Sequence, residues 1–103
     1  MTWGDFITLK EVYQKRIESQ LSQLRGKVDE LSQQATQAEA YLQIEYHQWV
    51  SHLRFKQERA QLRYEELKNS GERSWEDFQD GVEHSLTDLK NSVDQTMLRF
   101  SYP

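Results

Sequence analysis

The sequence has no cysteine, and its single proline, Pro103, is the last residue. Without cysteine the chain has no disulfide framework, no thiol nucleophile and no cysteine-based zinc site. A proline-free interior lacks the residue that most strongly breaks helices, and runs of β-branched residues, which favour strands, are few. With only four glycines there is no glycine-rich phosphate loop. These absences predict an all-α protein.

Long hydrophobic runs are also missing. Nowhere are there about eighteen consecutive apolar residues, so we expect no transmembrane segment. The first residues, Met-Thr-Trp-Gly-Asp-Phe, lack the basic segment and apolar run of a signal peptide. We therefore expect a cytoplasmic protein.

Apolar residues make up only 36% of the chain, while charged residues reach 29%. A thick globular core needs closer to half apolar residues, but helical seams need only two or three in seven. Disorder would also suit such polarity. We favour helical seams because the apolar residues include 12% aromatics and recur at regular intervals.

One apolar stripe, here called the first stripe, recurs in alternating steps of four and three residues, the spacing of a coiled coil. A second step of four at Leu42–Tyr46 is a stutter, where a change of packing partner is plausible. Only Gly26 interrupts residues 8–68, at a cost of about 1 kcal/mol, so we expect one helix over 8–68. The first stripe comprises Ile17, Leu21, Leu24, Val28, Leu31, Ala35, Ala38 and Leu42.

The clearest break is Asn69-Ser70-Gly71, where Gly71 suggests a helix C-cap. We expect a turn over 69–73, Ser74 as the next N-cap, and a second helix over 74–99. The prediction is one unit over 1–103: a segment 1–7 and an antiparallel coiled-coil hairpin.

The hairpin leaves part of the longer helix without a partner. A second helix of about 40 Å covers only residues 43–68 of a first helix of about 90 Å. The first stripe would then be solvated, which marks an interface. We therefore expect self-association into a homo-oligomer through these eight residues.

Two stretches of the chain resemble a family of small bacterial helical coiled-coil proteins, some of them stress-response proteins. They are Tyr13-x-x-Arg16-Ile17-x-x-Gln20-Leu21 and Ser70-Gly71-x-x-x-Trp75-Glu76-Asp77-Phe78-x-x-Gly81-Val82-Glu83, with Arg99-Phe100 at the end. The resemblance implies a helical hairpin with a stress or scaffold role, and it brings no catalytic residues.

Candidate chemistry is sparse. His47 and His52 are five residues apart and do not face one site on a helix. His84 is four residues from both Asp80 and Asp88, so weak metal binding is possible there, although a solvated surface stripe explains the pattern as well. We find no serine elbow. We expect no enzyme, no metal and no cofactor.

The aromatic residues near the chain ends are candidates for partner binding, because aromatic anchors dominate interface energies. A net charge of −4 argues against nucleic acid. Peripheral membrane contact stays open, since the second helix is amphipathic. Two functions compete: a structural or adaptor protein with a stress-related role, and a helical protein that coats a lipid or hydrophobic polymer surface. The partner-binding candidates are Trp3, Phe6, Phe100 and Tyr102.

Overall fold

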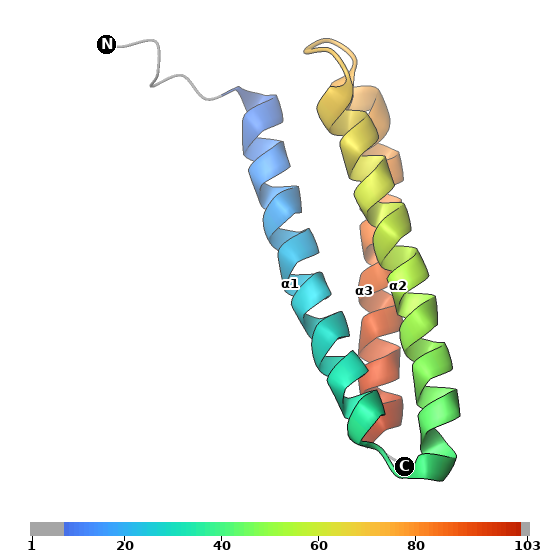
Figure 1. The fold of residues 1–103 in the computed structure, drawn as a ribbon. Helices are drawn as coiled ribbons and strands as arrows, with labels where there is room; N and C mark the ends of the chain where they lie inside the picture. Colours follow the sequence, from blue (N-terminus) through green and yellow to red (C-terminus); the bar gives the residue numbers. More distant parts are fainter. Residues whose placement is uncertain (1–7, 102–103) are drawn as a thin grey trace.

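Three long helices lie side by side in the computed structural model, which describes residues 8–101. Helix α1 spans Leu9–Gln37, α2 spans Ala40–Asn69 and α3 spans Gln79–Ser101, preceded by the 3-10 turn η2, Trp75–Phe78. Helices α1 and α3 run in the same direction and α2 runs against both (Figure 1). The prediction of an all-helical chain is confirmed, but the architecture is a three-helix bundle and not a two-helix hairpin.

The single helix predicted over 8–68 is wrong, because the chain reverses at Ala38 and Glu39. Both residues are extended, with ψ of 160° and 147° and ordinary negative φ, so the turn requires neither glycine nor proline. The Gln43 side-chain amide donates to the carbonyls of Thr36 and Ala38, at 3.1 and 2.9 Å. These bonds satisfy carbonyls that the end of α1 leaves without a helical partner.

The reversal creates the core. A straight helix would leave the first stripe in water, whereas the folded-back chain packs it against α2 and α3 in one continuous apolar cluster. Burial of apolar area stabilises by about 25 cal/mol per Å², which outweighs the few helical hydrogen bonds lost at the turn. The most completely buried side chains come from all three helices: Ile17, Val28, Leu53, Leu67, Val82, Leu89 and Val93.

The connection from α2 to α3 also differs in detail from the prediction. Helix α2 ends at Asn69 and Ser70 is its C-cap, with its backbone N–H donating to the Leu67 carbonyl. None of the described glycines has a positive φ, so Gly71 is not a left-handed cap. Ser74 precedes η2 but makes no side-chain capping bond. The third helix therefore begins through a tight 3-10 turn that buries Trp75.

Polar contacts also join the three helices. The buried Lys10 ammonium of α1 donates to the carbonyls of Lys68 and Ser70, at 3.2 and 2.6 Å, where the C-terminus of α2 carries partial negative charge. One ion pair joins each pair of helices, and each such surface pair contributes about 0–1 kcal/mol. The pairs are Arg16–Glu83, Arg54–Asp29 and Lys56–Asp88, at 2.7, 2.9 and 3.0 Å.

Candidate functional site

The first stripe lies inside the chain and not on its surface. Its first six residues are buried, from Ile17 at 0% exposure to Ala35 at 0%, and Ala38 and Leu42 pack half-buried against the same cluster. Self-association through these residues was expected because a two-helix hairpin would leave the first stripe in water. Because α2 and α3 cover that stripe, it is the core of the bundle.

The terminal aromatic residues divide into two groups. Phe100 stacks on Tyr46, with ring centroids 4.2 Å apart, and lies against Trp49 at 5.9 Å. It closes the contact between the end of α3 and the start of α2, so the expectation that Phe100 is a free docking residue is corrected to internal packing. Trp3, Phe6 and Tyr102 lie outside the described residues.

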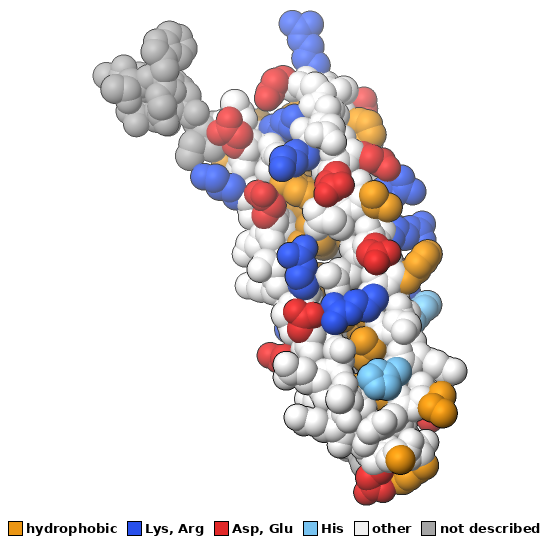
Figure 2. Space-filling model, viewed as in Figure 1, with side chains coloured by type: hydrophobic (Ala, Val, Ile, Leu, Met, Phe, Trp, Pro, Cys, Tyr) orange, Lys and Arg blue, Asp and Glu red, His pale blue; other side chains and the backbone are white. Residues whose placement is uncertain are grey.

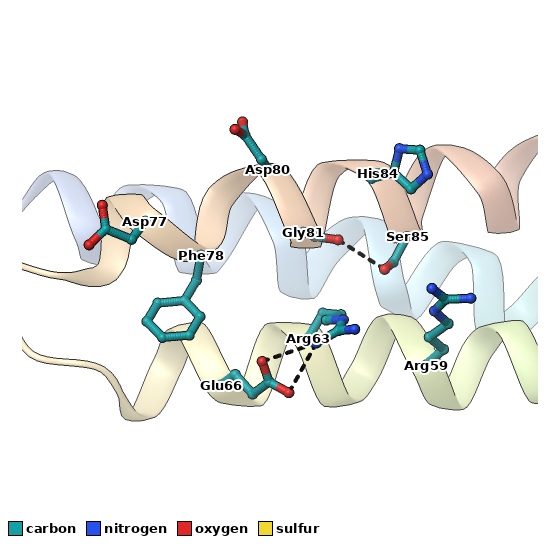
Figure 3. A pocket seen from close by; sticks show the side chains of 9 residues that line it. All are labelled: Arg59, Arg63, Glu66, Asp77, Phe78, Asp80, Gly81, His84 and Ser85. Carbon is teal, nitrogen blue, oxygen red and sulfur yellow. Dashed lines mark hydrogen bonds and ion pairs between the residues drawn. The ribbon is translucent and has the colours of Figure 1, made fainter.

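A groove of about 540 Å³ runs between α2 and the start of α3 (Figure 3). Arg59 and Arg63 line its α2 side, but Arg63 binds Glu66 of its own helix at 3.4 Å. Two further carboxylates line the α3 side, and the Asp80 side chain points away from α2 in this view. With two arginines against three carboxylates, the groove has no single sign of charge with which to select an anion or a cation.

The groove also brings His84 and Ser85 to one side, without forming a nucleophile–base pair. The Ser85 hydroxyl donates to the Gly81 carbonyl at 2.9 Å within α3. Asp88 is bound by Lys56, which ties it to α2. Across residues 8–101, no group of three His, Asp or Glu side chains is placed to hold a metal ion.

Two buried phenols mark the contacts of α1. The Tyr13 hydroxyl donates to Glu83 at 2.9 Å, and the Tyr13 ring lies 5.5 Å from Trp75. Burial, reinforced by that carboxylate, raises the pKa of the Tyr13 phenol. Burial also raises the pKa of Tyr64, whose hydroxyl has no hydrogen-bond partner in the described structure. Neither phenol lines the groove between α2 and α3, and we interpret both as packing residues.

The feature with an interaction surface is the outer side of α2. Four large apolar residues there are 60–76% exposed, and they lie about 180° around the helix from its buried residues. Figure 2 shows hydrophobic side chains spaced down this side of the molecule. Next to Ile44 a shallow depression of about 500 Å³ is lined by Gln43, His47, Gln48 and Ser51. We call this set the outer stripe: Tyr41, Ile44, Gln48, Ser51, Phe55, Glu58 and Leu62.

Sequence reasoning missed the outer stripe although its signal is present. The seven positions recur in strictly alternating steps of three and four residues, which is a heptad pattern of its own. The expectation from the sequence was one apolar side on each helix. Because α2 carries apolar residues on two opposite sides, only the structure shows which side its own chain uses.

Comparison with known proteins adds no relative: no family model, no curated protein and no solved structure matches the sequence. The resemblance to small bacterial stress-response proteins therefore stays a prediction. Among the helices of the described part of the chain, none is long and apolar enough to cross a membrane.

Proposed function

We propose that this protein is a non-enzymatic structural protein that acts through helix-mediated contacts between protein chains, with the outer stripe of α2 as its contact surface. The observation that carries the proposal is the second heptad pattern on α2. Tyr41, Ile44 and Phe55 are 76%, 74% and 64% exposed, although each lies on a helix whose opposite side is fully packed. The support for the proposal is therefore a row of exposed large apolar residues, interspersed with polar ones, at the spacing of a coiled-coil contact.

The alternative, coating of a lipid or polymer surface, has less support. It relied on the apolar side of the last helix, which would lie on that surface. In the bundle Val82, Leu86, Leu89 and Val93 are buried against the other helices. Coating through α3 would require the bundle to open and expose its whole core. A stress-related role stays a prediction.

The test compares two exposed substitutions in the native cell. Phe55→Asp adds a charge to the outer stripe, and Leu98→Asp adds the same charge at a 60% exposed position on α3. Both side chains are solvated in the single chain, so we expect both variants to keep the fold and wild-type helicity. In native lysates the wild type and Leu98→Asp should elute in an assembly larger than one chain. Phe55→Asp should elute later, and an unchanged elution of Phe55→Asp would refute the proposed function.

A further inference from the structure

The partner of the outer stripe can be specified further, on the basis of the proposed function. We propose that the outer stripe binds the outer stripe of a second copy of this chain, with the two α2 helices antiparallel. From Tyr41 to Glu58 the stripe is self-complementary in that orientation and not in the parallel one.

The antiparallel register follows from the heptad positions. In an antiparallel pair each a position faces a d position of the other helix. Tyr41, Gln48 and Phe55 take the a positions, and Ile44, Ser51 and Glu58 take the d positions. One register satisfies all of them: Ile44 faces Phe55 of the second copy, Gln48 faces Ser51, and Tyr41 faces Glu58.

Each layer of this register is chemically matched. The two Ile44–Phe55 layers are apolar, and they flank a central pair of Gln48–Ser51 layers whose amide and hydroxyl groups can bond each other. A polar central layer fixes the register of a coiled coil. At each end the Tyr41 hydroxyl can donate to the Glu58 carboxylate of the second copy.

A parallel pair lacks this match. It would place Glu58 against Glu58 of the second copy, and like charges that face each other are destabilising. The flanking charges also favour the antiparallel pair. Glu45 and Arg59 lie on the same flank of the outer stripe, and neither is in an ion pair within residues 8–101. When α2 is reversed, Glu45 of one copy approaches Arg59 of the other.

The area available suits a dimer of moderate affinity. Each fully buried aromatic side chain covers roughly 150–250 Å². With Ile44 counted at the low end of that range, the exposed parts of Tyr41, Ile44 and Phe55 supply on the order of 400 Å² per copy. With the flanking polar residues the total reaches about 1,200 Å² for both copies, the lower end of stable specific interfaces. We therefore expect a dimer at micromolar concentration.

The first measurement is the mass of the purified full chain by light scattering after size exclusion. Wild type and Leu98→Asp should have twice the chain mass of 12.4 kDa at micromolar concentration. Phe55→Asp should have the mass of one chain, with an unchanged circular dichroism spectrum. Wild type that stays at the mass of one chain throughout the micromolar range would overturn the proposal.

The second measurement tests the register by disulfide formation. Because the chain has no native cysteine, any disulfide must join the substituted positions. Tyr41→Cys and Glu58→Cys are made as separate variants that keep Ile44 and Phe55. In the antiparallel dimer, each substituted position is about 25 Å from its own symmetry mate, too far for a disulfide. Oxidation should cross-link a mixture of the two variants and neither variant alone. Self-cross-linking of either variant alone would overturn the antiparallel arrangement.

The outcomes separate this inference from the proposed function. If the purified chain is monomeric while the assembly in the cell still depends on Phe55, the partner is a different protein: the inference falls and the proposed function stands. If the assembly in the cell does not respond to Phe55→Asp, the proposed function falls, whatever the purified chain does.

Discussion

Ile17→Ala is the substitution that best separates a three-helix bundle from a two-helix hairpin. Ile17 is 0% exposed and lies on the first stripe of α1. In the bundle it is core of a single chain, whereas in the hairpin it would be buried only by another copy. Its matched control is Val12→Ala, an apolar truncation on the same helix at a position that is 55% exposed.

The expected cost follows from the atoms removed. Ile17→Ala deletes three carbon groups at about 0.8 kcal/mol each, and the cavity left in a packed core adds to this, giving about 3–4 kcal/mol. For a domain near this size each 1 kcal/mol lowers Tm by roughly 4–8 °C. We therefore expect Ile17→Ala to melt about 12–32 °C below the wild type. Val12→Ala should melt within a few degrees of it.

The assay is urea unfolding followed by circular dichroism, at two widely separated protein concentrations. A core residue of one chain lowers the unfolding free energy by the same amount at both concentrations. If Ile17→Ala unfolds like the wild type, or if its deficit appears only at the higher concentration, where copies associate, the placement of α1 against α2 and α3 is wrong.

Two further predictions concern Phe100 and the buried phenols. Phe100→Ala should lower the unfolding free energy by about 2 kcal/mol in chemical unfolding, because Phe100 is a half-buried aromatic residue that stacks on Tyr46. If the variant is as stable as the wild type, Phe100 is again a candidate docking residue. Burial raises the pKa of Tyr13 and Tyr64 above the ordinary value of 10.0, so these phenols stay protonated in the folded chain while they ionise in the unfolded one. Stability should therefore be constant with respect to these groups below pH 10.0 and fall as the pH rises above it. Tyr13→Phe should show a shallower fall in urea unfolding across that range, and an equally steep fall would contradict the assignment.

Much of the fold could be read from local pattern. The first stripe of α1, the helix that passes through Gly26 and the break after Lys68 are all visible in the sequence, because helical periodicity and breaks depend on residues a few positions apart. The reversal at Ala38–Glu39 could not be read in this way. It uses no glycine or proline, and its only local sign was the stutter between Ala38 and Tyr46.

The outer stripe was likewise only partly predictable from the sequence. The heptad spacing of Tyr41, Ile44 and Phe55 is a property of the sequence alone, but so is the spacing of the residues on the other side of α2. Which side is core depends on where α1 and α3 dock, and that is decided by contacts between residues far apart in the chain, such as Tyr13 with Glu83. The sequence by itself determined that the chain is helical and where apolar stripes lie along it. The tertiary structure alone decided that the first stripe is interior and the outer stripe exposed, because burial is a property of the assembled helices and not of any one of them.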